Sequence, residues 1–400
     1  MNSFQPTPKI PTMKITFKKM VLLLGQLTLL TAAFATEAPA KPHGQDKDPV
    51  VLSFSTVGDS RQDPVAFDPS TGPLTAQDKI WLQNSKAWSR IMQGVQAQKS
   101  KLLFFNGDMI MGYGLAGPTP SNSVADVVGS DLMAFYRQYA FWRGMVAPLM
   151  ESGTYVVPVA GNHEVQSKAS GKKSQVENEN AWRANMGDLI IDTARFKTIV
   201  GQDATNINVQ NQGGVDGLKS DQGQLTYSFD VNDSHFSVVN TDAVGSDNFA
   251  PSEWLKRDLM AAQSRGAKHF FVFGHKPAFT YAYKKPTPDN FEAVGLDKYP
   301  EKRDAFWRVI EQYGATYFCG HEHEFNMMQP NGAAWQVMVG SGGSPWDAQP
   351  GEATMNPASD RAYAWATVSI HKSGKVDINA YGFSDSYGPN RLLKRVILAR

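Results

Sequence analysis

Two histidines two positions apart, His321 and His323, are the residues of this sequence best placed to hold a metal ion together. In an extended segment the side chains at i and i+2 point the same way, so both imidazoles can reach one site. The apolar run 315–319 predicts a short buried strand that ends at Gly320, and imidazoles at a strand end suit a metal at a sheet edge. A surface turn that carries two histidines by chance is the alternative.

Polar residues follow a glycine at or near the ends of four other predicted strands. The strands are expected at 50–57, 101–105, 154–159 and 269–273, and the residues after them are Asp59, Asp108, Asn162 with His163, and His275. A glycine there lets the backbone turn sharply and approach an ion closely. Carboxylates, imidazoles and one amide oxygen are the ligands expected for two adjacent divalent ions with one aspartate bridging them.

Apolar residues at helical spacing alternate with these strands. The spacing predicts helices at 76–98, 131–150 and 302–312 and another through Trp254 and Met260, with further strands at 225–230, 235–240, 335–339, 364–371 and 375–381. Strands that alternate with helices and carry polar residues at their ends predict an α/β protein with layered sheets. Two polar segments interrupt this order: a loop at 109–130, and at 166–223 an insertion or lid with one helix around 180–186.

The composition limits the class of partner. In 400 residues, 42% are hydrophobic, and 39 Lys and Arg stand against 38 Asp and Glu. The apolar content is enough for a proper core, and the near-neutral balance argues against a nucleic-acid polymer as partner. A small anionic substrate remains compatible, because a bound metal supplies positive charge locally.

The first residues predict an export signal. A basic start at Lys14, Lys18 and Lys19 precedes an apolar run that ends at Ala33-Phe34-Ala35, a small-x-small cleavage pattern. We expect a signal peptide at 1–35, with translation from Met1 or Met13, a linker at 36–49, and a domain at 50–400. A membrane anchor is the alternative, but the apolar run is short for a span, so no stable anchor is expected.

One cysteine, Cys319, excludes an intramolecular disulfide. Its place in an apolar strand favours a core role over metal ligation. Export without disulfides suits a bacterial periplasmic protein better than an animal secreted one, and the expected location is therefore periplasmic or secreted.

In this order, the motifs closely resemble those of the calcineurin-like metallophosphoesterase superfamily, in its purple-acid-phosphatase-like branch. They are an Asp motif, Gly-Asp, Gly-Asn-His-Glu, Gly-His and Gly-His-x-His, spread over residues 50–343. The resemblance implies a four-layer α/β/β/α sandwich of two mixed sheets flanked by helices. It also implies two metal ions, divalent or of mixed valence (Fe, Mn or Zn), and attack on phosphorus by a metal-held hydroxide.

The resemblance implies a role for each motif residue. The implied ligands are Asp59 and His323 for the first metal, Asp108 as the bridge, and Asn162, His275 and His321 for the second metal. His163 resembles the histidine that contacts the phosphate and protonates the leaving oxygen, and Glu164 is implied to orient it.

Two positions depart from the family pattern. Arg61 stands where many members have a histidine, so the first metal is expected to lack one protein ligand; Arg61 either contacts a phosphate oxygen or pairs with Asp63. Met111 stands where purple acid phosphatases have a tyrosine, with Tyr113 two residues further on. We therefore predict no iron–phenolate colour.

The remaining histidines and aromatic residues have plainer interpretations. His235, His269 and His371 are interpreted as structural and His43 as part of the linker, whereas Tyr281, Tyr283 and Lys284 either line a substrate pocket or form a solvated loop. The expected function is hydrolysis of a small phosphate monoester by an exported enzyme. The alternatives are a phosphodiesterase acting on nucleotides or lipid head groups, which the segments 109–130 and 166–223 would decide, and a non-catalytic binding protein that keeps the fold.

Overall fold

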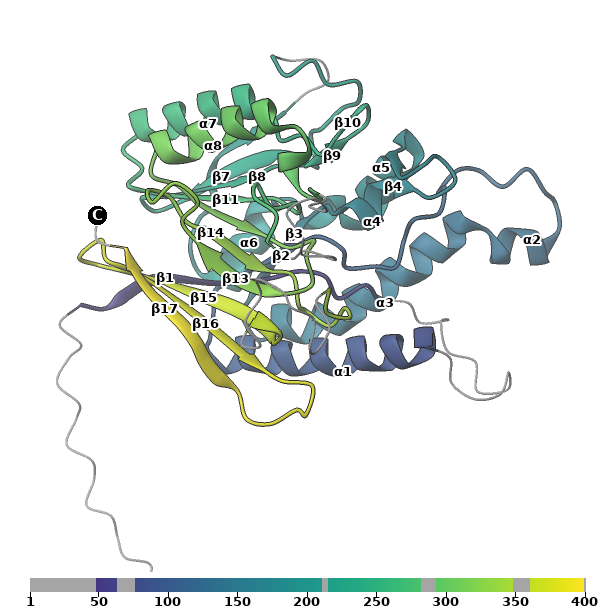
Figure 1. Ribbon diagram of the computed structural model, residues 1–400, viewed down its shortest axis with the longest axis horizontal. Coiled ribbons are helices and arrows are strands. Elements are labelled where there is room, and N and C mark those ends of the chain that lie inside the picture. Colours follow the sequence, from purple (N-terminus) through teal and green to yellow (C-terminus); the bar gives the residue numbers. More distant parts are fainter. Residues whose placement is uncertain (1–47, 63–75, 211–214, 282–292, 348–359, 399–400) are drawn as a thin grey trace, which may run out of the picture. The chain divides into compact units, whose positions relative to one another are not determined.

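Two mixed β-sheets form the centre of the chain (Figure 1). The computed structural model describes residues 48–62, 76–210, 215–281, 293–347 and 360–398. The predicted signal peptide lies outside the described residues, as do most of the linker with His43, and the side chains of Asp63, Tyr283 and Lys284. Among the described helices, none is long and apolar enough to span a membrane.

The first sheet has six strands in the order β17-β16-β15-β1-β2-β3. Their bounds are β1 Val50–Val57, β2 Leu102–Asn106, β3 Tyr155–Val159, β15 Tyr363–His371, β16 Val376–Phe383 and β17 Arg391–Leu398. Strands β1, β2 and β3 run parallel, and β15 to β17 extend the sheet in antiparallel fashion from β1. The carboxyl ends of β1, β2 and β3 therefore meet at one edge.

The second sheet has seven strands in the order β13-β14-β12-β11-β8-β7-β6. Their bounds are β6 Thr205–Val209, β7 Tyr227–Val231, β8 Ser234–Val238, β11 His269–Phe273, β12 Thr316–Cys319, β13 Phe325–Met328 and β14 Gln336–Val339. Strands β8, β11, β12 and β14 are parallel, whereas β6, β7 and β13 pair antiparallel at the two sides.

The two sheets pack through a layer of phenylalanines. Alternate residues of each strand face this layer, as the period of a β-strand requires, and Phe54 of β1 packs edge-to-face on rings from both sheets. Phe104 of β2 and Phe273 of β11 stack with ring centroids 3.7 Å apart. Each aromatic pair adds about 0.5–1.5 kcal/mol beyond the area that it buries. This layer fixes one sheet against the other.

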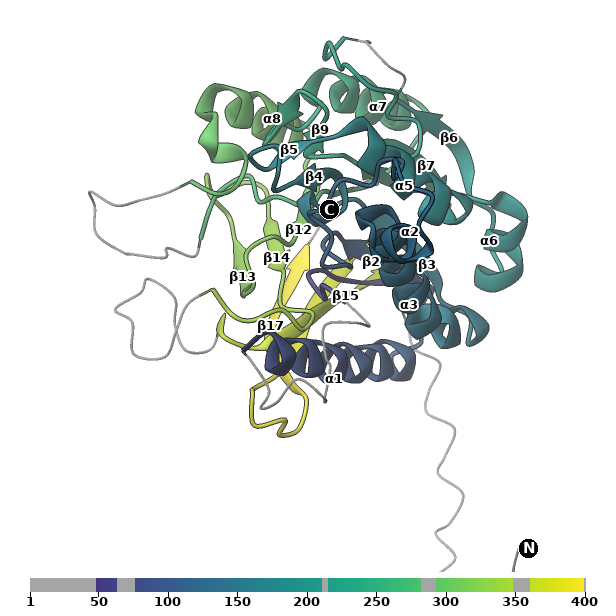
Figure 2. The same ribbon diagram turned by 90° about the vertical axis from the view of Figure 1, so that its right-hand side faces the viewer.

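Helices cover the outer face of each sheet, which confirms the predicted four-layer α/β/β/α arrangement (Figures 1 and 2). Helices α1 Ala76–Ala97 and α3 Asp131–Glu151 pack on the first sheet, and α7 Ser252–Ser264 and α8 Pro300–Gln312 pack on the second. Each lies within a few residues of its predicted bounds. On the first sheet, Gly94 of α1 lies so close to Trp365 of β15 that a Cβ atom would stand 2.5 Å from the indole ring.

The two polar segments contain more regular structure than the sequence predicts. The loop expected at 109–130 contains α2 Val124–Gly129, and after it the chain forms α4 Asn162–Val165. Beyond α4 lie β4 Gln166–Ser167, β5 Lys173–Ser174, α5 Val176–Met186, the 3₁₀ turn Gly187–Leu189, α6 Thr193–Val200 and β6. Later short elements are β9 Asp242–Ala243, β10 Ser246–Asp247 and the 3₁₀ turn Leu296–Lys298. The described part of the segment 166–223 thus holds two α-helices where one was predicted, and its strand β6 belongs to the second sheet.

A buried histidine between two carboxylates ties β7 and β8 to helix α7. Nδ1 of His235 lies 2.5 Å from Asp230 Oδ1, and Nε2 lies 2.9 Å from Asp258 Oδ2. Burial works to lower the pKa of His235, but the hydrogen bonds to the two carboxylates outweigh it and raise the pKa. Burial alone would raise the pKa values of Asp230 and Asp258, yet hydrogen bonds from His235 lower both.

This network predicts a pH-dependent contribution to stability. The contribution of the raised His235 pKa is fully present below the unfolded value of about 6.5 and is lost as the pH rises through the folded value. The contribution of the lowered pKa values of Asp230 and Asp258 is present above about pH 4 and is lost as the pH falls further. His235→Ala should therefore lower the free energy of unfolding by about 3–5 kcal/mol at about pH 5.5, and by less at about pH 9. Urea unfolding at both pH values measures this, and equal losses would show that charge is not the source.

Candidate metal centre

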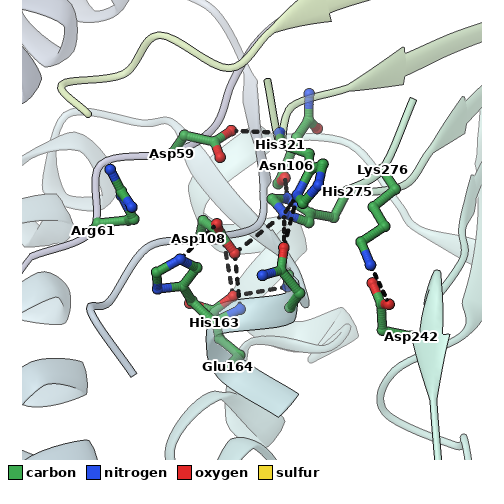
Figure 3. A network of polar contacts seen from close by, with 12 residues as sticks. Asp59, Arg61, Asn106, Asp108, His163, Glu164, Asp242, His275, Lys276 and His321 are labelled. Carbon is green, nitrogen blue, oxygen red and sulfur yellow. Dashed lines mark hydrogen bonds and ion pairs between the residues drawn. The ribbon is translucent and has the colours of Figure 1, made fainter. Parts of the chain in front are cut away.

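Residues at the carboxyl ends of five parallel strands converge where the two sheets meet (Figure 3). Asp59, Asp108 and Asn162 follow β1, β2 and β3 of the first sheet. From the second sheet come His275 after β11, and the pair His321 and His323 after β12. The structure brings all six predicted ligands together, although they span more than 260 positions of the sequence.

One group of ligand atoms surrounds the amide oxygen of Asn162. Oδ1 lies 2.7 Å from His275 Nε2 and 2.8 Å from His321 Nδ1, and these two nitrogens are 3.1 Å apart. Asp108 Oδ1 completes the group at 3.2 Å from His275 Nε2. Asp108, His275 and His321 each offer a ligand atom within the spacing that one ion can bridge.

A second group shares Asp108 with the first. Atoms of Asp59, Asp108 and His323 all lie within 4.8 Å of one another. Oδ1 of Asp59 is buried and makes no hydrogen bond within the described chain, and His323 Nε2 is 3.7 Å from it. A buried carboxylate oxygen without a partner is costly unless a cation lies beside it, so the donor set fits a metal ion. Two groups joined by one carboxylate fit a dinuclear site.

Backbone carbonyls turn three of the imidazoles toward the centre. Nδ1 of His275 meets Asn106 O at 2.7 Å, Nδ1 of His323 meets Pro345 O at 2.7 Å, and Nδ1 of His163 meets the carbonyl oxygen of Met111 at 2.6 Å. A ring that donates from Nδ1 to a carbonyl keeps Nε2 as the atom that can bind a ligand. The protein backbone thus fixes the orientation of these three imidazole rings without the help of a ligand.

The backbone of the centre adopts conformations that most residues avoid. Asp59, Asp108 and His321 have φ values of 65°, 53° and 72°, in the left-handed region. Gly320 allows the strand ends to approach: a Cβ atom there would lie 2.2 Å from Asp59 Oδ2, which accepts the His321 N–H at 2.9 Å. Only glycine permits this contact, which explains the glycine in the Gly-His-x-His motif.

Burial disfavours the charged forms of the residues in the centre, so it shifts the pKa values of an acid and a base in opposite directions. It raises the pKa of Asp59 well above its usual value, because burial penalises the carboxylate. Burial, together with the charge of His275, lowers the pKa of His321 well below that of a free imidazole. A neutral imidazole and a carboxylate that needs a counter-charge are the forms in which these groups bind a metal.

Arg61 lies beside Asp59 and His163 (Figure 3). Its Nε donates to Ser344 Oγ at 2.8 Å, which fixes the base of the guanidinium. Burial and then the charge of Arg61 lower the pKa of His323 to about 4, so the guanidinium acts on the centre itself. Because Asp63 lies outside the described residues, the structure leaves the alternative pairing of Arg61 untested.

The hydrogen-bond partners of Glu164 are backbone groups rather than the His163 ring. Its carboxylate accepts the backbone N–H groups of Asp108, Met109, Ile110 and Gly161 at 2.7–3.2 Å. Because Glu164 is fully buried, these four donors replace the water that its charge loses. Its role is therefore to hold the loop after β2 and the turn before α4, which carry Asp108 and Asn162. An orienting effect on His163 would therefore act through this turn, and that role stays a prediction.

Two features near the centre were missed by sequence reasoning. Lys276, directly after His275, is buried and its Nζ lies 2.6 Å from Asp242 Oδ1 (Figure 3). Tyr113 places its hydroxyl against the side-chain amide of Asn162. Asp242 follows a predicted strand, as the ligands do, but lacks the glycine that precedes them.

Other predicted candidates lie in structural positions. Cys319 is buried within β12, and its Sγ points at the Val337 carbonyl 3.9 Å away. The hydroxyl of Tyr281 donates to Asp360. His269 is buried at the start of β11, and His371 at the end of β15 bonds Asp377 at 2.8 Å.

Comparisons with known proteins identify the family and the fold. The sequence profile of the calcineurin-like phosphoesterases matches residues 81–325. A purple acid phosphatase isolated from yellow lupin (Lupinus luteus) seeds shares the fold with a TM-score of 0.52 and 12% identity, over 86% of this chain and 53% of the lupin chain. This chain thus spans about half the length of the lupin enzyme. A dimetal phosphatase from Danio rerio aligns over 87% of this chain and 99% of its own, with 10% identity and a TM-score of 0.48. No curated protein matches the sequence significantly.

The two ligand groups predict a stoichiometry of two divalent ions per chain. His323→Ala should remove one ion and His321→Ala the other, whereas Asp108→Asn should weaken both because the two groups share Asp108. Metal analysis after dialysis against Mn²⁺ or Zn²⁺ measures this. His371→Gln, outside both groups, is the matched control and should keep two ions. Equal metal content in all four variants would contradict the assignment.

Proposed function

The chain belongs to the calcineurin-like phosphoesterases, and on this premise we propose that it hydrolyses small phosphate monoesters at this centre. The observation that carries the proposal is that two groups of ligand atoms share the carboxylate of Asp108. When bound, two divalent ions (Fe, Mn or Zn) would bind phosphate oxygens and activate water for attack on phosphorus. The protein's contribution is to fix their ligands and to position the ester.

His163 is the residue that we propose to contact the phosphate and to protonate the leaving oxygen. Its Nε2 lies 3.5 Å from Asp108 Oδ2, and Met111 O holds its Nδ1. Burial lowers the pKa of His163 to about 3, so the ring begins as a neutral group. A bound phosphate dianion favours the protonated ring, which ties the proton to the presence of substrate.

Arg61 supports a preference for monoesters. A monoester carries up to two negative charges on its terminal oxygens, whereas a diester carries one. The guanidinium adds a fixed positive charge beside Asp59 and His323, and a planar guanidinium suits two phosphate oxygens at once. A phosphodiesterase is the second candidate, since the metal ligands alone would serve either ester.

We also propose that the enzyme acts outside the cytoplasm, on the basis of the export signal predicted for residues 1–35. Its substrate is then a small phosphorylated molecule of that compartment. The near-neutral sequence argues against a nucleic-acid polymer as substrate.

The first kinetic test compares p-nitrophenyl phosphate with bis-p-nitrophenyl phosphate, with Mn²⁺, Zn²⁺ or Fe²⁺ added. We expect metal-dependent turnover that favours the monoester, and a fall in kcat of about 10²–10⁴-fold in His163→Ala. His371→Gln should keep the wild-type rate. Preference for the diester would support the second candidate. No turnover of either ester, with one ion or none bound, would support a non-catalytic binding protein.

Arg61 gives a second prediction. If the guanidinium holds two phosphate oxygens, Arg61→Ala should lower kcat/KM for the monoester by about 10–100-fold, as loss of a charged hydrogen bond does. Arg61→Lys should recover only part of this loss, because an ammonium group cannot hold two oxygens in one plane. The diester should be affected less. An equal loss for both esters would remove Arg61 as the source of selectivity.

A further inference from the structure

Tyr113 lies in the loop after β2, where it is held at the edge of the metal centre. Its backbone N–H donates to His163 O at 3.1 Å, and its carbonyl accepts the N–H of Lys168 at 2.9 Å. Its φ of 64° places it in the left-handed region, which non-glycine residues seldom adopt. The backbone is therefore fixed on both sides, at some cost, with the ring directed toward the centre.

The side chain of Tyr113 contacts two residues of the centre at once. Its hydroxyl accepts a hydrogen bond from Nδ2 of Asn162, and its ring lies on the His163 ring with the centroids 4.0 Å apart. The other atom of the same amide, Oδ1, is the one that meets His275 and His321. Tyr113 thus touches the face of Asn162 opposite to the candidate metal position.

The orientation of the Asn162 amide decides whether the site can bind a cation. The oxygen and nitrogen of a carboxamide are almost equal in size, and rotation of the group by half a turn exchanges them. In one orientation an acceptor faces the ion, and in the other an NH₂ group would face it. The backbone of Asn162 does not select between them. A group that accepts a hydrogen bond from Nδ2 selects the orientation in which Oδ1 faces the ion.

We propose that Tyr113 is a positioning residue that fixes the Asn162 amide with its oxygen toward the ion bound by His275 and His321. This inference rests on the proposed function. It differs from a role as a metal ligand, because the hydroxyl contacts the nitrogen of Asn162 and not the oxygen that meets His275 and His321. The ring supports His163 separately, so the hydroxyl and the ring have distinct effects.

The test measures Mn²⁺ binding to the metal-free protein by isothermal titration calorimetry. Tyr113→Phe keeps the ring and removes the hydroxyl, so we expect one of the two binding steps to weaken by about 10–100-fold and the other to stay unchanged. Tyr227→Phe is the matched control: it removes a buried hydroxyl that donates to Pro158 O at 2.9 Å and makes no contact with the Asn162 amide. Excess Mn²⁺ should return the hydrolysis rate of Tyr113→Phe toward that of the wild type.

A double-mutant cycle separates positioning from a general structural effect. If Tyr113 acts through Asn162, then Tyr113→Phe should cause little further loss of Mn²⁺ affinity in an Asn162→Ala background. Additive losses, or wild-type affinity at both steps in Tyr113→Phe, would overturn the inference while leaving the proposed function intact. A wild-type protein that binds fewer than two ions would overturn both.

Discussion

The hydrogen bond from the backbone N–H of His321 to Asp59 Oδ2 joins the two sheets at the point where the metal centre forms. It spans 2.9 Å between a residue that follows β1 and one that follows β12. Two neighbouring bonds repeat the connection: Gly58 N–H to Val339 O at 2.9 Å, and Asn106 Nδ2 to Cys319 O at 3.3 Å. Each ligand group draws on both sheets, so neither can form unless these bonds hold the sheets in register.

The interior of the protein holds that register against the strain of the centre. Non-glycine residues in unusual backbone conformations cost about 1–3 kcal/mol each, and Asp59, Asp108 and His321 all have positive φ. The buried, unpaired oxygen of Asp59 adds a further cost. Stacking such as that of Phe104 on Phe273 lies next to these strand ends and offsets the strain with rigid contacts. The centre is therefore a locally unstable part of a stable sandwich, as a preformed ligand site requires.

The sequence was informative where burial and chemistry follow one local pattern. Strand β11 was predicted at 269–273, where it lies, because its last four residues are apolar and a glycine and a histidine follow it. Strand β17 was missed because its apolar residues do not alternate along the strand: Leu393 packs against the core, whereas Leu392 and Ile397 are exposed. The helix α5 was placed only in part, since few of its residues are apolar and only Ala181, Trp182 and Met186 among these are buried. The partners of Glu164 could not be predicted, because they are backbone groups that only the fold brings together.

Buried polar contacts tie the chain beyond α4 to the two-stranded sheet of β9 and β10. Gln166 donates to both Asp242 and Asp247 at 3.0 Å, and Ser174 donates to the Asp242 carbonyl at 2.6 Å. Lys276 pairs with the same Asp242, so this part of the segment connects directly to the residue after His275. Segments that open and close have few buried contacts, whereas β4 and β5 have several. The part of the chain predicted as an insertion or lid thus begins with a segment that buried hydrogen bonds fix in place beside the residue that follows His275.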